Sequence, residues 1–289
     1  MRQTKIALST AHMTKLVKDA YVPPLQHGDH LTVAEFERRY ATMPELHKAE
    51  LINGVVYVPS PFTETGDPSI PPLRNGDHLT VAEFERRYQN MSRLKRADLI
   101  DGVVYMGSPV TMDMHAEPHF DLVGWLWHYR AYTPGVQGGD NATLILPVGM
   151  AQPQSDACLR IRPDHGGRTK TRKGYVAGGV ELAAEVAASS VSFDFNEKHA
   201  AYEQNGIIEY VVWRVEDREI DWFYLKRGKY QHLPLTKDGL YKSKVFPGLW
   251  LDAAPMIAGD MVKVLEVGQQ GIASPEHRRF VDKLRKRKK

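Results

Sequence analysis

Two carboxylates lie within one apolar segment of the sequence. Residues 180–190 read VELAAEVAASS, with apolar side chains at both odd and even positions, which is typical of a strand buried on both faces. Glu181 and Glu185 are four residues apart, so both side chains point to the same face of such a strand. An unpaired buried carboxylate is costly unless it loses its charge. The segment therefore predicts a metal ion or a cationic partner beside these glutamates.

A candidate cation follows in the next element. Residues 194–206 read DFNEKHAAYEQNG, where Asp194 and Glu197 resemble a capping box and the final NG is a typical helix end. The pattern predicts a short helix that carries Asp194, Lys198 and Tyr202 on one face. Lys198 could then serve a hydrolytic site at the end of the strand. The alternative is a lysine in solvent on the helix surface.

A third acidic residue starts another predicted strand. Asp156 lies in residues 152–162, QPQSDACLRIR. If Asp156 and Glu185 lie on adjacent strands, their oxygens suit Mg²⁺, with Mn²⁺ as a substitute, and Lys198 could orient or deprotonate a water. This combination points to phosphodiester hydrolysis. Without metal, the two carboxylates would repel, which predicts a raised pKa for at least one of them. Five further side chains could lie nearby: Asp98, His115, His119, Glu181 and Tyr202.

The two histidines of this group raise the question of zinc. His115 and His119 are four residues apart, at the beginning of an amphipathic helix that is predicted from about Pro118. Two histidines at this spacing can bind zinc, but the pair straddles the helix start and no third soft ligand is spaced with it. Polar packing at a helix start is the favoured interpretation.

Composition bounds the class of protein. The chain has 289 residues, of which 42% are hydrophobic and 25% charged, values typical of a soluble globular protein with one large domain or two small ones. It lacks an apolar run of the ~20 residues that cross a membrane, and its opening residues lack a signal-peptide core. The single cysteine, Cys158, excludes an internal disulfide and lies in an apolar strand pattern, where a small buried side chain suffices. We therefore expect a cytoplasmic protein.

The charge is unevenly distributed along the sequence. The net charge is +3, but residues 278–289 contain eight Lys or Arg and one Asp, a net of +7, which leaves −4 for the rest. A basic tail can touch phosphates, although such tails are more often simply solvated. The pattern allows nucleic-acid binding without establishing it.

A tandem repeat organises the first third of the chain. Residues 22–61 and 70–109 align without gaps at an offset of 48, and 13 residues, GDHLTVAEFERRY, are identical from Gly28 and from Gly76. Each copy predicts a capped helix followed by a hairpin, whose Asn-Gly or Asp-Gly pair favours a type I′ turn. Two copies are too few for a solenoid. We therefore predict an N-terminal extension at 1–69, joined by the Pro-rich residues 68–72, and a main domain at 70–289 that contains the second copy.

The remaining sequence completes a mixed sheet with helices. It predicts a turn at 138–140 before a short strand at 143–147, then strands at 207–215 and 219–225. The basic, glycine-rich residues 163–179 are interpreted as either a lid that faces phosphate or a plain solvated loop. Later residues are expected to close the sheet, and a last helix begins near Pro275.

Several of these motifs, in this order, resemble the Uma-two (Uma2) family of restriction-endonuclease-like proteins in the PD-(D/E)XK nuclease superfamily. They are the strand with Asp156, the Glu185-x-Val strand, Lys198-x-x-x-Tyr202, and GIIEYVVW at 206–213. The resemblance covers residues 76–285 and includes four more segments: 99–109, the His115/His119 segment, 138–143 and 245–251.

The resemblance implies a restriction-endonuclease-like fold and assigns roles. Asp156 and Glu185 would be the metal ligands, and Lys198 on the helix would replace the superfamily lysine, whose position, 187, is Ala here. Asp98 falls where the family usually has glutamate. Ser155 and Val180 stand where the family has proline.

These observations predict an α/β protein with a mixed central sheet flanked by helices. The expected function is a Mg²⁺-dependent endonuclease that acts on nucleic acid, DNA above all, with no membrane partner and with a homodimer as a compatible assembly. Two alternatives stay open: a catalytically silent nuclease-like binding module, and a metal-dependent hydrolase of another substrate.

Overall fold

The computed structural model describes most of the chain. Outside the described residues lie the first 21 residues, Pro68 of the expected linker, the end of the 180–190 segment, and the side chain of Asp194. The described ranges are residues 22–26, 28–43, 49–52, 54–57, 67, 69–91, 94, 96–106, 112–149, 151–172, 174–187 and 193–288. No helix in these ranges is long and apolar enough to cross a membrane.

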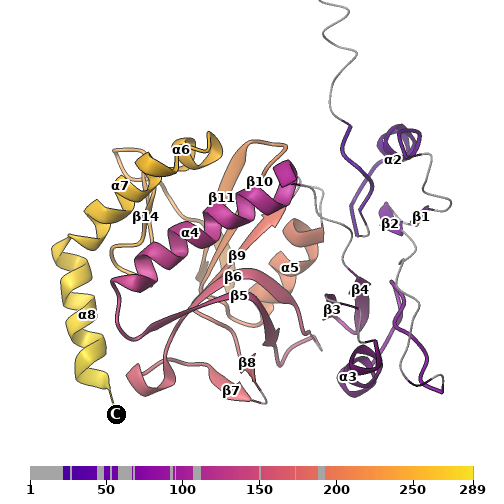
Figure 1. Ribbon diagram of the computed structural model, residues 1–289, viewed down its shortest axis with the longest axis horizontal. Helices are drawn as coiled ribbons and strands as arrows, with labels where there is room; N and C mark the ends of the chain where they lie inside the picture. The colour runs from indigo at the N-terminus through magenta and orange to yellow at the C-terminus, as the bar shows by residue number, and fades with distance from the viewer. Residues whose placement is uncertain are drawn as a thin grey trace, which may run out of the picture.

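The centre of the molecule is an eight-stranded mixed sheet (Figure 1). Its strand order is β12-β11-β10-β9-β6-β5-β8-β7, with parallel pairing between β9 and β10 and between β5 and β8, and antiparallel pairing elsewhere. The strands are β5 (Val136–Ile145), β6 (Gln154–Ile161), β7 (Lys170–Arg172), β8 (Tyr175–Ala177), β9 (Leu182–Ala187), β10 (Glu209–Arg214), β11 (Glu219–Lys226) and β12 (Lys229–His232).

Helices cover both faces of this sheet. On one face pack α4 (Glu117–Ala131), α6 (Ala253–Ile257), α7 (Met261–Ile272) and α8 (Pro275–Arg287), and on the other packs α5 (Phe193–Gln204) (Figure 1). The period-2 alternation of β9 sorts its residues accordingly: Ala184 and Val186 join the α4 core, while Ala183 and Ala187 join the α5 core. The predicted mixed sheet flanked by helices is confirmed.

The two repeat copies form matching helix–hairpin units. The first contains α2 (Val33–Tyr40), β1 (Glu50–Ile52) and β2 (Val55–Tyr57), and the second α3 (Val81–Asn90), β3 (Ala97–Ile100) and β4 (Val103–Met106). Thr32 and Thr80 cap the helices by accepting hydrogen bonds from the backbone of Glu35 and Glu83. In the second hairpin Asp101 (φ 49°) and Gly102 (φ 78°) both have positive φ, as a type I′ turn requires.

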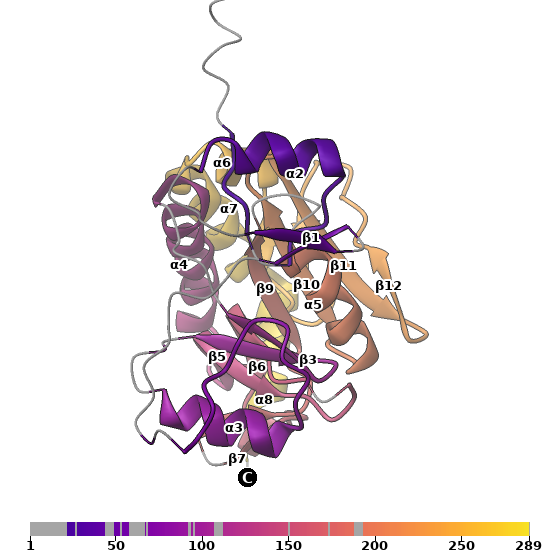
Figure 2. The same ribbon diagram turned by 90° about the vertical axis from the view of Figure 1, so that its right-hand side faces the viewer.

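Both copies lie on the α5 side of the large sheet, with α2 and α3 at opposite ends of that side (Figure 2). The second copy is tied to the sheet, since the backbone N–H of Gln152 donates to the carbonyl of Leu99 at 2.5 Å. The first copy has its own small core around Leu25, Leu31 and Val56. It meets the body through polar contacts such as His30 Nε2–Glu197 Oε1 at 3.1 Å.

Removing residues 1–69 is expected to change the free energy of unfolding by less than about 1 kcal/mol, because the first copy meets the body through a partly exposed pair, His30–Glu197, and a long one, Arg39–Glu216 at 3.9 Å. Thermal melting of the truncated and full-length proteins checks this. Unfolding of the truncated protein at ambient temperature would contradict the assignment of 1–69 as an extension.

Three local expectations are wrong. Residues 138–140 lie inside β5 instead of forming a turn, because the missing side chain at Gly139 leaves room for Cys158; a Cβ there would be 3.1 Å from its Sγ. Residues 163–179 form a short 3₁₀ turn and the β7–β8 hairpin on the sheet edge instead of a plain loop. The capping role expected of Asp194 concerns a side chain that lies outside the described residues. Strands β13 (Tyr241–Lys242) and β14 (Trp250–Leu251) pair with each other instead of closing the large sheet.

Candidate functional site

Two neighbouring strands bring the acidic residues together. Strands β6 and β9 are antiparallel, with Ala157 opposite Ala184, so the same register places Asp156 opposite Glu185. At this position carboxylate oxygens accept hydrogen bonds from backbone N–H groups of the two strands. The backbone N–H of Asp156 donates to Glu185 Oε2 at 3.3 Å, and that of Val186 donates to Asp156 Oδ2 at 2.9 Å. The strands therefore hold both carboxylates directly.

Lys198 points from α5 onto this pair of strands. Its Nζ donates to Glu185 Oε2 at 2.8 Å and to the carbonyl of Gln154 at 3.0 Å, and its side chain is 0% exposed. The alternative of a lysine in solvent is therefore wrong. One helical turn further on, the Tyr202 hydroxyl donates to Glu185 Oε1 at 2.6 Å. The i, i+4 spacing on α5 thus places two donors on the two oxygens of one carboxylate.

Burial raises the free-energy cost of leaving either charge of this pair without a partner. Glu185 and Lys198 are both 0% exposed, so either charge alone would be strongly unfavourable. Burial, together with the Glu185 carboxylate, raises the pKa of Tyr202 well above its ordinary value, so this phenol stays a hydrogen-bond donor. Glu185 is thereby fixed in position by an ammonium, a phenol and a backbone N–H.

Asp156 has a different cationic neighbour. Arg96 Nη1 donates to Asp156 Oδ1 at 2.9 Å, and His115 Nε2 lies 3.8 Å from Oδ2. Burial alone would raise the pKa of Asp156, but the charges of Arg96, Lys198 and His115 and the Val186 N–H outweigh it and hold the pKa well below the usual range. The expectation of a raised pKa from repelling carboxylates therefore does not hold for Asp156, because the cations are built into the fold.

The sequence interpretation missed Arg96. It precedes β3 and is two residues from Asp98, so the strand period gives the two side chains a common face, and its Nε lies 3.6 Å from Asp98 Oδ2. Arg96 also donates to the carbonyl of Gln154 at 2.8 Å. The sequence feature that could have identified it is an arginine two residues before an aspartate, Arg96 and Asp98, in the second repeat copy.

Of the supporting residues, Asp98 positions a strand, whereas His115 and His119 make contacts at the edge of the cluster. Asp98 Oδ1 accepts from the backbone N–H of Gln154 at 2.6 Å, which anchors the second copy to the start of β6. His119 Nε2 lies 2.9 Å from the carbonyl of Asp156 and 3.0 Å from Asp140 Oδ1. The rings of His115 and His119 are 5.5 Å apart. Both histidines therefore line the Asp156 side of the cluster.

Glu181 is not part of the cluster. Its Oε2 accepts from the backbone N–H of Ile161, at the far end of β6 from Asp156. The side chain does share a strand face with Glu185, but four residues of strand separate the two by about 13 Å. Burial raises the pKa of Glu181.

Cys158 is buried as well, which raises the pKa of its thiol to about 12 and makes it an inert packing residue.

The donor atoms fit a hard divalent cation that keeps most of its water. Asp156 and Glu185 offer four carboxylate oxygens with two lone pairs each; Glu185 Oε2 accepts two hydrogen bonds, from Lys198 and the Asp156 N–H, and each of the other three accepts at least one. Within the described ranges, no three His, Cys, Asp or Glu side chains gather closely enough to hold a metal by themselves. Mg²⁺ needs only one or two protein carboxylates when substrate oxygens and waters complete its shell, so these two suffice.

The side chains around Asp156 are more exposed than Asp156 itself. Asp156 is nearly fully buried, but the side chains around it are partly exposed: Arg96 25%, His115 21%, His119 18% and Asp140 58%. Among the described residues, Arg96 and the two histidines therefore form a partly exposed edge of the cluster.

Comparison with known proteins gives the same classification as the motifs. The sequence model of the Uma2 family, described as "Putative restriction endonuclease", matches residues 81–254, from α3 of the second copy to the start of α6. The crystal structure described as "a putative nuclease belonging to DUF820", from Anabaena variabilis ATCC 29413, has a TM-score of 0.45 and 8% identity and covers 62% of this chain and 99% of its own. No curated protein matches the chain. Because the family match spans more than half of the sequence, the protein belongs to the Uma2 family of restriction-endonuclease-like proteins.

Proposed function

We propose that this protein is a metal-dependent endonuclease that hydrolyses phosphodiester bonds of nucleic acid, with DNA as the first substrate to test. The observation that carries the proposal is the fully buried Glu185–Lys198 pair, which lies against Asp156 on the adjacent strand. A buried ion pair of this kind contributes little net stability compared with an apolar pair of similar size. Its presence beside a second acidic residue is better explained by chemistry.

Asp156 and Glu185 would hold a magnesium ion, and such an ion supplies charge neutralisation of the phosphate and a more acidic water. The residues of the chain then have separate tasks. Lys198, whose Nζ is 2.8 Å from Glu185 Oε2, would orient the attacking water and stabilise negative charge that develops on the phosphate. Tyr202 fixes the other oxygen of Glu185. Arg96, on the exposed side, would receive the incoming phosphate.

A second candidate function is a catalytically silent nuclease-like module. It is favoured by one observation: all four oxygens of Asp156 and Glu185 already accept hydrogen bonds from the chain itself. In such a module the cluster would be a structural ion-pair network. The two candidates differ in whether phosphodiester bonds are broken.

Nicking of a supercoiled plasmid in Mg²⁺ or Mn²⁺ tests the proposal. We expect cleavage by the wild type and a loss on the order of 10²-fold or more in Glu185→Ala, because the metal ligand and the partner of Lys198 are both removed. Glu181→Gln is the matched control, since it changes a buried glutamate of the same segment away from the cluster and should leave cleavage unchanged. A single-stranded RNA of the same sequence decides between DNA and RNA. Equal activity of Glu185→Ala and wild type would contradict the proposal.

A further inference from the structure

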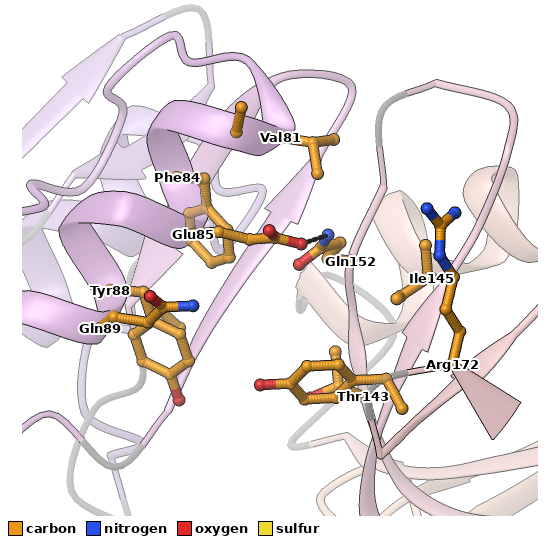
Figure 3. Close-up of a pocket in the computed structure, with 12 residues that line it drawn as sticks. Val81, Phe84, Glu85, Tyr88, Gln89, Thr143, Ile145, Gln152 and Arg172 are labelled. Carbon is orange, nitrogen blue, oxygen red and sulfur yellow. Dashed lines mark hydrogen bonds between the residues drawn. The ribbon is translucent and has the colours of Figure 1, made fainter.

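A pocket of about 370 Å³ lies between helix α3 of the second copy and the edge of the large sheet (Figure 3). One wall is α3, which contributes Tyr88 and Gln89, and the other is formed by β5, β7 and β8, which contribute Thr143, Arg172 and Tyr175. Gln152 lies between the two walls, where its Nε2 donates to Glu85 Oε1 at 3.0 Å. The volume is at the lower end of the range of small-ligand sites.

Gln154 connects a residue that lines the pocket to the carboxylate cluster. The side-chain amide nitrogen of Gln154 lies 3.4 Å from the Tyr88 hydroxyl, at the pocket, and the backbone carbonyl of Gln154 accepts from Lys198 Nζ at 3.0 Å. Along the chain, Gln152 precedes Asp156 by four residues, about 13 Å of extended backbone. Because nucleotides follow one another at ~3.4 Å or more along a strand, a group in the pocket is within a few nucleotides of a phosphate bound at Asp156.

The lining has the chemistry that recognises a nucleobase. Tyr88 and Tyr175 supply aromatic surface from opposite walls, and Val81, Phe84 and Ile145 supply apolar surface. The Gln89 and Gln152 amides and the Glu85 carboxylate can bond the N–H and C=O groups of a base edge. Arg172 is exposed at the rim, where a guanidinium can meet a backbone phosphate. A gap left by imperfect packing between apolar faces would carry few of these polar groups.

We propose that this pocket binds one unstacked nucleobase of the substrate strand, within a few nucleotides of the phosphate that is cleaved. The proposal rests on the proposed nuclease function and adds a base-binding subsite that only the second repeat copy completes. Stacking on one aromatic ring typically changes affinity by about 5- to 150-fold. Tyr175 is 42% exposed, so its replacement by alanine removes ring surface with little disturbance of the fold.

Binding of single-stranded oligonucleotides that carry 2-aminopurine at one position tests the pocket. The wild type is measured in EDTA, which prevents metal-dependent cleavage, and the 2-aminopurine is moved along the strand. We expect a rise in fluorescence at one position, where the base leaves the stack. Tyr175→Ala should abolish that rise and weaken binding by about 5-fold or more. Tyr132→Ala, which removes an exposed tyrosine at the end of α4, is the matched control and should behave as wild type.

The outcomes separate the pocket from the nuclease function. If the wild type nicks plasmid while Tyr175→Ala and Tyr132→Ala bind and fluoresce alike, the pocket proposal is wrong and the nuclease proposal stands. If the wild type neither cleaves nor binds any oligonucleotide, both proposals are wrong. Melting curves of both variants identify any loss of folding. In that case Arg172→Ala, at the exposed rim, provides the second test, with an expected loss of affinity that weakens as salt is raised.

Discussion

Replacement of Lys198 by methionine is expected to lower the free energy of unfolding by about 3–5 kcal/mol, because it leaves the Glu185 carboxylate buried without its cationic partner. Methionine keeps most of the length of the side chain, so the loss would come from charge and not from a cavity. Glu185 would then hold its charge without the ammonium, or it would take up a proton. Urea unfolding monitored by circular dichroism measures the difference.

A double substitution separates the ion pair from the packing. Lys198→Met combined with Glu185→Gln removes both charges, while the amide oxygen introduced at position 185 can still accept from Tyr202, so we expect most of the lost stability to return. Lys229→Met is the matched control, because Lys229 also pairs with a glutamate, Glu203, but is exposed, and its loss should leave the midpoint nearly unchanged. If Lys198→Met unfolds at the same urea concentration as Lys229→Met, the buried pair is not a charged one.

The second large effect concerns divalent metal. If Asp156 and Glu185 hold Mg²⁺ or Mn²⁺, metal at a hundredfold excess over its Kd should stabilise the fold by about 2.7 kcal/mol. For a chain of 289 residues that corresponds to a rise of roughly 4–5 °C in Tm. Glu185→Gln should lose most of this rise, because one of the two ligand carboxylates becomes a neutral amide. In metal-free buffer the same substitution should lower Tm, since it leaves the Lys198 ammonium buried without its anionic partner.

Melting curves with and without millimolar Mn²⁺ measure this gain for each variant. Glu181→Gln is again the informative control, because it removes a buried carboxylate from the residue that precedes β9 and should keep the full metal-dependent gain. A wild type that gains nothing, or a Glu185→Gln variant that gains as much as wild type, would exclude a two-carboxylate metal site at these strands.

Short-range patterns predicted a large part of the fold and of the candidate site. The four-residue spacing of Lys198 and Tyr202 placed both on one helix face, and the structure directs both onto Glu185. The Asp-Gly pair at the second hairpin predicted its turn, and both residues have the positive φ that this turn needs. These features depend on neighbours within a few residues, where the period of a helix or strand is decisive.

Long-range contacts were harder to predict. Arg96 meets Asp156 across 60 residues of sequence, and no local pattern states that the second repeat copy docks beside β6. The same spacing rule that correctly grouped Glu181 and Glu185 on one strand face could not tell that their distance along the strand separates them. Gly138 and Gly139 looked like a turn because the close approach of Cys158, which favours glycine there, exists only in the folded sheet.

Lys198 lies on a helix, whereas its partner Glu185 lies on a strand, so completion of the cluster depends on which elements have docked on the sheet. The β6–β9 pairing alone brings Asp156 and Glu185 together, but the ammonium and the phenol arrive only when α5 docks on the sheet. Arg96 arrives only when the second repeat copy docks, a contact that closes a long loop of chain. With the sheet formed and these two elements detached, the two carboxylates would lack the ammonium, the phenol and the guanidinium. Under the nuclease function proposed above, the site would therefore be complete only when both elements have docked.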